Sequence, residues 1–216
     1  MSISEYLAAG HKTAVHHLIR YAWAEAVLEE MRPRRLLDVA CGSGYGSHGI
    51  ALVLDDAEIV GADYDPVAVE FARAHHRAHN LSFVEADITR WGKPLGSDPF
   101  DCVVSFDTLE HIEHREIAMQ NLVNHLTPDG VLLFSTPVRS SNVLNPGWEH
   151  HKLEYSRRSL YDFLRRYFGE VLAPDLQTLP CVEVFDQVNR GIEPQFYLLK
   201  MNPVVCRRPI CIEHGR

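Results

Sequence analysis

The sequence predicts a Rossmann-like α/β fold, a doubly wound and mostly parallel sheet of seven strands with helices on both faces. Two observations support this. Between residues 35 and 135, apolar segments of strand length alternate with segments of helix length, which is typical of βαβ units. The first apolar segment, Leu36–Ala40, also runs directly into the glycine-rich turn Gly42-Ser43-Gly44-Tyr45-Gly46. A strand, a glycine turn and then a helix bring bare backbone close to a ligand.

The helices are predicted from helical spacing of apolar residues and from their end signals. An N-terminal helix is expected to end before Pro33, and the dipeptide Asp65-Pro66 suits the start of another. The segment Pro128-Asp129-Gly130 ends a third, and Ser156 can cap a fourth. The predicted helices cover residues 3–30, 43–54, 65–80, 113–126 and 156–168.

The strands are predicted from short apolar runs bounded by turn residues. The run Phe100–Phe106 is nearly uninterrupted, as expected for a parallel strand that is buried on both faces. Five strands are expected at 35–40, 57–62, 81–86, 100–106 and 131–135, and a weaker pair at 171–179 and 195–201.

We expect one domain, residues 1–216, with residues 1–32 as an N-terminal helical cap. Residues 136–156 include Pro137, Pro146 and Gly147, and we interpret them as a long irregular substrate loop, because loops of this length in compact domains tend to be functional.

Composition narrows the classes of function. The net charge of −8 argues against a nucleic-acid partner. No apolar run is long enough to span a membrane, and the N-terminus lacks the pattern of a secretory signal. The five cysteines are odd in number and mostly isolated, which predicts a reduced, cytoplasmic protein. Cys206 and Cys211 lack a second pair, so no zinc site is expected there.

Acidic residues follow successive predicted strands. Asp63 comes after the second strand, Asp87 after the third and Asp107 after the fourth. The carboxyl ends of parallel strands share one edge of the sheet, where ligands bind in doubly wound folds. A carboxylate at Asp63 can accept hydrogen bonds from both hydroxyls of a ribose, and one at Asp87 from an adenine amine.

In the glycine turn, in the acidic residues after the strands and in the segments around them, the chain resembles class I S-adenosylmethionine-dependent methyltransferases. The resemblance covers about residues 18–138 and preserves the order and spacing of the family's motifs. A dinucleotide-binding protein fits less well, because its turn would have a Gly-x-Gly-x-x-Gly pattern. The matching segments are Leu37–Ser47, Val60–Asp63, Glu85–Ile88, Phe100–Phe106, Leu109–His111, Leu126–Gly130 and Phe134–Pro137.

The resemblance implies S-adenosylmethionine as the cofactor. Asp38 and the amides near Gly42 and Gly44 would hold its amino-acid part, and Asp63 its ribose. The adenine would lie by Asp87. Phe106 would line the sulfonium end of the cofactor, with packing in the core as the competing role. The full set of expected cofactor-binding residues is Asp38, Ala40, Gly42, Gly44, Tyr45, Asp63, Tyr64, Asp87, Ile88 and Phe106.

Histidines and carboxylates gather on the acceptor side. Two functional interpretations remain open. In one, His111 or His151 is a general base oriented by a carboxylate, with Glu110 and His150 beside it. In the other, a divalent ion binds the acceptor hydroxyls; carboxylates favour Mg²⁺, and added imidazoles favour Mn²⁺ or a similar ion. A structural role, capping the next helix, competes for Glu110. The expected metal ligands are Asp107, Glu110, His111 and His151.

The flanking segments narrow the expected acceptor. The segments His17–Ala24, Ala40–Ser47 and His151–Ser156 resemble methyltransferases of polysaccharide biosynthesis, and with the arginine-rich composition they point to the actinobacterial methylmannose polysaccharide type. This resemblance implies a sugar or oligosaccharide hydroxyl as the acceptor.

Other functions remain as alternatives. The Asp107-x-x-Glu110-His111 pattern also resembles small-RNA 3′-terminal 2′-O-methyltransferases, which carry Glu at the position of Asp107. A small-molecule or quinone-type hydroxyl is a further alternative, and a non-catalytic module ranks last.

Several side chains receive plainer expectations. His75, His76 and His79 are expected to be solvated, and His16 and His17 to be exposed on the N-terminal helix. Trp148 is expected to stack on a sugar or to pack in the core. A homodimer through residues 181–216 is expected as a candidate assembly.

Overall fold

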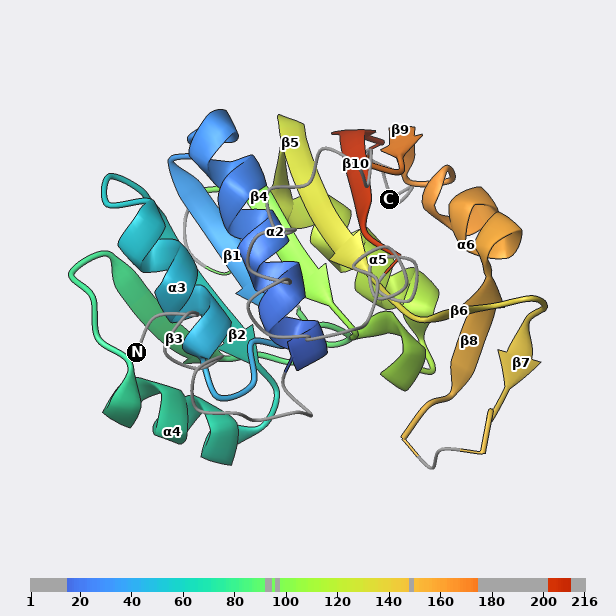
Figure 1. The fold of residues 1–216 in the computed structure, drawn as a ribbon, viewed down its shortest axis with the longest axis horizontal. Helices are drawn as coiled ribbons and strands as arrows, with labels where there is room; N and C mark the ends of the chain where they lie inside the picture. Colours follow the sequence, from blue (N-terminus) through green and yellow to red (C-terminus); the bar gives the residue numbers. More distant parts are fainter. Residues whose placement is uncertain (1–14, 92–94, 96–97, 148–149, 175–201, 211–216) are drawn as a thin grey trace, which may run out of the picture.

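The computed structural model describes residues 15–91, 95, 98–147, 150–174 and 202–210, with side chains from residue 17 onward. Its centre is a seven-stranded sheet in the order β3-β2-β1-β4-β5-β10-β9 (Figure 1). Strand β10 is antiparallel to both of its neighbours, and the other paired strands are parallel. The strands are β1 Arg35–Val39, β2 Glu58–Asp63, β3 Leu81–Glu85, β4 Phe100–Phe106, β5 Leu126–Ser135, β9 Phe168–Leu172 and β10 Val204–Pro209. The predicted Rossmann-like, seven-stranded fold is therefore confirmed.

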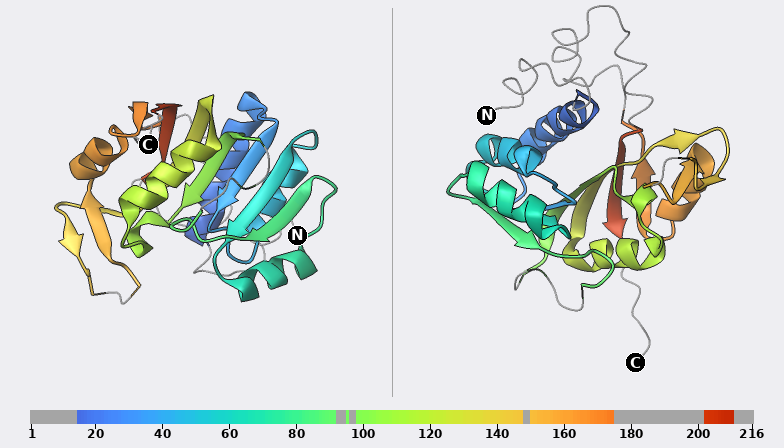
Figure 2. Two further views of the ribbon diagram at one scale, coloured as in Figure 1. Left: turned by 180° about the vertical axis from the view of Figure 1, so that it is seen from behind. Right: turned by 90° about the horizontal axis from the view of Figure 1, so that it is seen from below.

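Helices cover both faces of the sheet (Figure 2). Helices α2 (Val15–Met31) and α3 (Tyr45–Val53) pack in one apolar cluster on one face. Helix α4 (Pro66–His75) packs against β2 and β3. Helices α5 (Arg115–His125) and α6 (Arg157–Leu164) belong to the cluster on the opposite face.

The alternation of side chains along the strands divides the core into these two layers. On β1, Leu36 faces the α2 cluster and Leu37 faces the α5 cluster, and both are fully buried. Burying a side chain of this size contributes about 1.5–3 kcal/mol to folding. Strands β1 and β4 are thus apolar on both faces, as the uninterrupted run Phe100–Phe106 predicted.

The ends of several elements differ from the predictions. The helix predicted over 65–80 stops at His75, and the one predicted over 156–168 stops at Leu164. Strand β9 therefore starts earlier than the predicted strand at 171–179. The predicted strand at 195–201 lies outside the described residues, and the sheet instead receives residues 204–209.

The expected irregular loop at 136–156 is wrong in part, because it contains a small sheet. Its strands are β6 (Val138–Arg139), β7 (Val143–Leu144) and β8 (Leu153–Ser156), in the order β6-β8-β7. Strand β8 is parallel to β6 and antiparallel to β7. This small sheet lies beyond the end of β5 (Figure 1), so it brings residues of the second half of the chain towards the ligand-binding edge.

The order of the strands reverses direction between β1 and β4, which is the switch point where doubly wound sheets bind ligands. None of the helices among the described residues has the length and apolar character required to cross a lipid bilayer.

Candidate active site

The glycine turn after β1 adopts a conformation that requires its glycines. Gly42 and Gly44 have φ values of 55° and 83°, in the left-handed region that glycine tolerates best. A Cβ at Gly44 would lie 2.6 Å from Ala72 Cβ and 2.7 Å from the Phe83 ring, whereas a Cβ at Gly42 would meet no atom within 4 Å. Gly44 is therefore needed for packing, while Gly42 exposes bare backbone to open space.

Asp38 lies beneath this turn and is fully buried. Both of its carboxylate oxygens lie 3.1 Å from the Tyr21 hydroxyl, and Ser47 Oγ donates to Oδ2 at 2.6 Å. Burial raises the pKa of Asp38 to about 7, although the hydrogen bonds from Ser47 and Tyr21 oppose this. Asp38 lines neither of the cavities described below, and its hydrogen bonds link β1 to α2 and α3 beneath the turn.

Asp63, at the end of β2, also supports the turn. Its Oδ2 accepts from the amide of Gly42 at 2.8 Å, and its Oδ1 accepts from the amide of Asp65 at 3.0 Å. The side chain is 7% exposed. The following residue, Tyr64, is 73% exposed and lines a cavity.

Two cavities lie along the carboxyl edge of the sheet. The first, of about 500 Å³, contains most of the expected adenine and acceptor residues. The second, of about 400 Å³, lies over the glycine turn. Ala40 and Asp107 line both, so the two cavities share a wall. The first is lined by Val39, Ala40, Tyr64, Ala86, Asp87, Ile88, Thr89, Asp107, Thr108, His111, Ile112, His150 and Lys152. The second is lined by His17, Tyr21, Ala40, Cys41, Gly42, Ser43, Tyr45, Phe106 and Asp107.

These cavities bring together most of the predicted cofactor residues. Gly42, Tyr45 and Phe106 line the one over the turn, and Asp87 and Ile88 line the other. Phe106 packs edge-on against Tyr21, with ring centroids 5.3 Å apart, so it belongs both to the core and to the cavity wall. An elongated ligand with a polar head over the glycine turn and a planar base by Asp87 fits this shape.

Asp107 lines the same cavity as His111, but it is not among the grouped side chains that could hold a metal ion. It adopts a positive φ of 47°, and its Oδ2 lies 2.8 Å from Arg20 Nη2. Arg20 is itself buried, on helix α2. The predicted metal ligand is thus held in an ion pair with α2, because the turn after β4 directs its carboxylate towards that helix.

Glu110, His111 and His151 form a compact group. One possible ligand atom from each residue lies within 4.8 Å of the others. Glu110 and His111 belong to the short 3₁₀ helix η1 (Leu109–His111), and His151 comes from the segment before β8. The imidazoles of His111 and His151 are nearly perpendicular, with centroids 4.7 Å apart. The group joins two distant parts of the chain, as predicted.

Hydrogen bonds fix the tautomer of each imidazole. The carbonyl oxygen of His150 can only accept, so His111 Nδ1, at 2.9 Å from it, carries a proton. His151 Nδ1 lies 2.6 Å from Glu154 Oε1, which likewise accepts. In both neutral rings the lone pair is then on Nε2. Burial lowers the pKa of His111, which favours its neutral form.

Glu154 has a second partner, Arg139 of strand β6. Arg139 Nε donates to Glu154 Oε2 while His151 occupies Oε1. Burial acts to raise the pKa of Glu154, but the hydrogen bonds from Arg139 and His151 outweigh it, so the pKa lies below its ordinary value.

Glu110 is in a different environment. It is 1% exposed, and Thr136 Oγ1 donates to its Oε2 at 2.8 Å. Burial, together with the nearby charge of Asp107, raises its pKa to about 8. The carboxyl therefore carries a proton at neutral pH in the absence of a cation, so a cation bound here would have to displace it.

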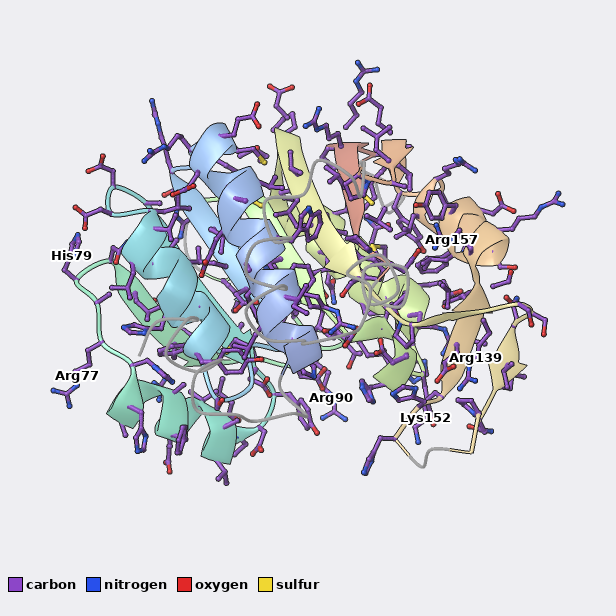
Figure 3. All side chains as sticks on the ribbon, viewed as in Figure 1. Arg77, His79, Arg90, Arg139, Lys152 and Arg157 are labelled. Atoms are coloured by element: carbon purple, nitrogen blue, oxygen red, sulfur yellow. The ribbon has the colours of Figure 1, made fainter. Side chains whose placement is uncertain are left out.

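Several residues of the site carry no sequence signal that singles them out. Tyr21, Lys152 and Thr136 line or support the cavities, and the Arg139–Glu154 pair depends on the unexpected small sheet. His150 contributes its backbone carbonyl to His111 and its side chain to the cavity wall. Lys152 and Arg139 both lie in the region of the small sheet (Figure 3). Trp148 and Glu149 lie outside the described residues.

The expectation for the other histidines was wrong at one position. His76 is 6% exposed and packs against His48, with ring centroids 5.1 Å apart. It lies just after α4 and points back beneath the glycine-turn helix α3. His75 and His79 are exposed, as expected, and His17 is exposed but also lines a cavity.

The sheet order, the glycine turn over β1 and the cavities at the switch point define the S-adenosylmethionine-dependent methyltransferase fold. A family model described as "Methyltransferase domain" matches residues 33–169. The chain belongs to this methyltransferase domain family.

Individual relatives are more distant. The malonyl-[acyl-carrier protein] O-methyltransferase of Bacillus cytotoxicus is 26% identical over 173 residues, which are 78% of this chain and 57% of that protein. The trans-aconitate 2-methyltransferase of Rhodopseudomonas palustris is 33% identical over 106 residues, 49% of this chain and 39% of that protein. The chain thus spans roughly two to three fifths of the length of these curated relatives.

Solved structures agree on the fold. The N-terminal domain of EvdMO1, determined in the presence of SAH and D-fucose, superposes with a TM-score of 0.62 at 16% identity. The match covers 87% of this chain and 82% of that one.

Proposed function

We propose that this protein is an S-adenosylmethionine-dependent O-methyltransferase whose acceptor is a hydroxyl of a sugar or oligosaccharide. The observation that carries the proposal is the shared wall between the two cavities. The cavity over the glycine turn meets the cavity containing His111 at Ala40 and Asp107. A cofactor with its polar head over the glycine turn and its adenine by Asp87 would thus cross this shared wall and present its reactive end beside the histidine group.

The residues present fit this cofactor. The open space at Gly42 leaves room for its polar head, Phe106 and Tyr21 provide an apolar wall, and Asp87 with Ile88 suits an adenine. When bound, S-adenosylmethionine supplies a methyl group that is already activated by its sulfonium. The protein then has to align the acceptor oxygen behind that methyl group and exclude water.

The acceptor hydroxyl must also lose a proton, and the histidine group is arranged to take it. His111 and His151 both have Nδ1 donating, so each neutral ring has a proton-accepting Nε2. The lowered pKa of His111 keeps that ring unprotonated at neutral pH. A neutral imidazole within reach of the hydroxyl can act as the general base.

The sugar acceptor is supported by the flanking sequence and by the polar side chains in the wall of the cavity that contains His111. Side chains at Asp107, His111 and Lys152 provide the hydrogen-bonding groups that a polyol needs. The N-terminal domain of EvdMO1, which shares this fold, was determined in the presence of SAH and D-fucose. The buried free thiols of Cys41, Cys102 and Cys206 support a reducing, cytoplasmic setting.

A divalent ion is the second candidate for activating the hydroxyl, and the specific observation that favours it is the Glu110–His111–His151 group. Two imidazoles and one carboxylate suit Mn²⁺ or a similar ion better than Mg²⁺. Because Glu110 is protonated at neutral pH without a cation, we expect metal binding to release a proton and to strengthen as the pH rises towards 8.

Cofactor binding and methyl transfer test the proposal in sequence. Calorimetry should detect S-adenosylmethionine binding, and its absence would end the proposal. Transfer of labelled methyl from the cofactor should then be screened over mono- and oligosaccharides, phenols, carboxylic acids and RNA 3′ ends. Transfer to a non-sugar alone would keep the methyltransferase and replace the acceptor.

Chelation separates the two ways of activating the hydroxyl. If a metal is used, EDTA should abolish transfer and added Mn²⁺ should restore it. Unchanged rates in EDTA would assign the proton transfer to histidine without a metal.

A further inference from the structure

Strand β6 and strand β8 of the small sheet together hold His151 through a carboxylate. Glu154, on β8, is 4% exposed in its side chain and has both oxygens engaged. Oε1 accepts from His151 Nδ1 at 2.6 Å, and Oε2 accepts from Arg139 Nε. Figure 3 shows Arg139 beside β8. The three side chains form a row that leads from solvent to the histidine group.

Each hydrogen bond in this row has a fixed donor and a fixed acceptor. Arginine has donors only, so the oxygen that it contacts must accept. A carboxylate can accept from Arg139 and from His151 at the same time, because it has two oxygens. The carboxylate then requires a proton on His151 Nδ1, which leaves the lone pair on Nε2. An amide at the same position has one oxygen and one donor group, so it can satisfy both neighbours only if His151 Nδ1 becomes the acceptor.

We propose that Glu154 is a positioning residue that fixes the Nδ1–H tautomer of His151, and that Arg139 sets the orientation of Glu154. This inference rests on the proposed function only in assigning His151 Nε2 as a group that accepts the proton of the acceptor hydroxyl or binds a metal ion. Neither Arg139 nor Glu154 lines the two cavities described above, so we infer that they act through His151 rather than on the acceptor. The small sheet thereby becomes part of the active-site machinery rather than a surface extension.

Three variants test this proposal. In Glu154→Gln, we expect Arg139 to attract the amide oxygen and to turn the NH₂ group towards His151. Nδ1 must then accept, so the proton moves to Nε2. In the double variant Arg139→Met/Glu154→Gln, the amide is free to turn and the Nδ1–H tautomer should return. Glu170→Gln is the matched control, since Glu170 pairs with Arg208 on the distant strands β9 and β10.

The measurement is two-dimensional NMR of ring nitrogens in ¹⁵N-histidine protein, in EDTA and without cofactor, with His151 assigned from a His151→Gln sample. Wild type and the control should show Nδ1–H at position 151, Glu154→Gln should show Nε2–H, and the double variant should show Nδ1–H. An Nε2–H wild type would overturn the proposal. An unchanged tautomer in Glu154→Gln would also overturn it.

A calorimetric measurement of S-adenosylmethionine affinity on the same samples keeps the two proposals separate. The tautomer result is independent of whether the cofactor binds or of which acceptor is used. Normal cofactor affinity in Glu154→Gln also shows that the variant has folded. With an acceptor available, the rate constant should fall by about 10²-fold or more in Glu154→Gln, in line with the loss of a general base, and recover in the double variant.

Discussion

His111 and His151 lie side by side but are held by different partners. The Nδ1 of His111 donates to a backbone carbonyl, which has no charge to offer, while that of His151 donates to a carboxylate backed by an arginine. Neighbouring titratable groups in contrasting environments are characteristic of acid–base sites. Their hydrogen-bond partners thus distinguish two imidazoles that cannot be told apart from the sequence alone.

Replacing either imidazole should stop methyl transfer without loss of the cofactor. We expect His111→Gln and His151→Gln to reduce the rate by about 10²–10⁴-fold, the usual contribution of a general base or metal ligand. S-adenosylmethionine affinity, measured by calorimetry, should change little. His79→Gln, at an exposed position just before the amino end of β3 (Figure 3), is the control, because the two cavities of the site lie along the carboxyl edge of the sheet. Full activity in both site variants would contradict the assignment.

The variant Glu110→Gln tests two properties of Glu110: the effect of its buried proton on stability, and its ability to bind a metal ion. Because the pKa of Glu110 is raised from 4.5 to about 8, the folded protein holds a proton that the unfolded chain releases. Its contribution to stability is therefore greatest below pH 4.5 and is lost as the pH rises towards 8. The glutamine variant should lose this component, which chemical unfolding at pH 5 and pH 8 would reveal. It should also lose Mn²⁺ binding if the group binds metal.

At the scale of elements, the glycine turn connects three parts of the fold. Asp38 on β1 accepts from Tyr21 of α2 and Ser47 of α3, and Asp63 on β2 accepts from the amide of Gly42. The cofactor cavity over the turn is therefore shaped by hydrogen bonds from beneath. Any change that loosens α2 should alter this cavity as well as the core.

Alanine substitutions at two glycines should have different effects. At Gly44 the new methyl group would collide with Ala72 and Phe83, and φ is 83°, so we expect a loss of about 2–5 kcal/mol in the free energy of unfolding. At Gly42 only the backbone cost of about 1–2 kcal/mol applies. Because the Gly42 methyl group would enter the cavity, cofactor affinity should fall by about tenfold or more. Equal stability losses would show that the turn rearranges.

The sequence predicted the central elements well because their signals are local. The strands β1, β2 and β4 each contain a short run of apolar residues, and the turn carries three glycines within five residues. The small sheet escaped prediction because β6 and β7 have two residues each, too short for any periodicity. Strand β10 was missed because Val204–Cys206 is apolar over only three residues before two arginines.

In the candidate site too, some residues could be predicted from local motifs and others could not. Residues tied to the ends of strands, such as Asp63, Asp87 and Phe106, could be placed from the order of motifs. The pairing of Asp107 with Arg20, and of Glu154 with Arg139, depends on where helix α2 and strand β6 lie. Such tertiary contacts join distant residues and leave no spacing pattern in a single sequence.

In the molecule as a whole, buried ionisable groups whose pKa values are shifted in opposite directions contribute to the dependence of stability on pH. Burial, then the nearby charge of His48, lowers the pKa of His76 to about 4, whereas burial raises the pKa of Asp38 to about 7. The histidine is thus held neutral in the fold while it would be protonated in the unfolded chain below pH 6.5. The carboxyl behaves in the opposite sense.

The contribution of His76 to stability should therefore fall as the pH drops from 6.5 towards 4, because the unfolded chain then binds the proton that His76 refuses. The raised pKa values of Asp38 and Glu110 act in the opposite sense. His76→Gln should remove the His76 contribution and so change the slope of the profile relative to wild type, measured as the midpoint of urea unfolding between pH 4 and pH 7. His75→Gln, at the exposed neighbouring position, should leave the slope unchanged. An unaltered slope in His76→Gln would place the acid sensitivity elsewhere.

Strand β10 occupies an interior place in the sheet, between β5 and β9, although it follows both in the chain. During synthesis, the facing edges of β5 and β9 are complete before residues 204–209 have left the ribosome. Those edges carry buried side chains such as Leu133, Phe134 and Phe168, and unpaired apolar edges readily join other chains. We therefore expect that the sheet can be completed only when β10 inserts between β5 and β9, and that until then these edges are open to pairing with another chain.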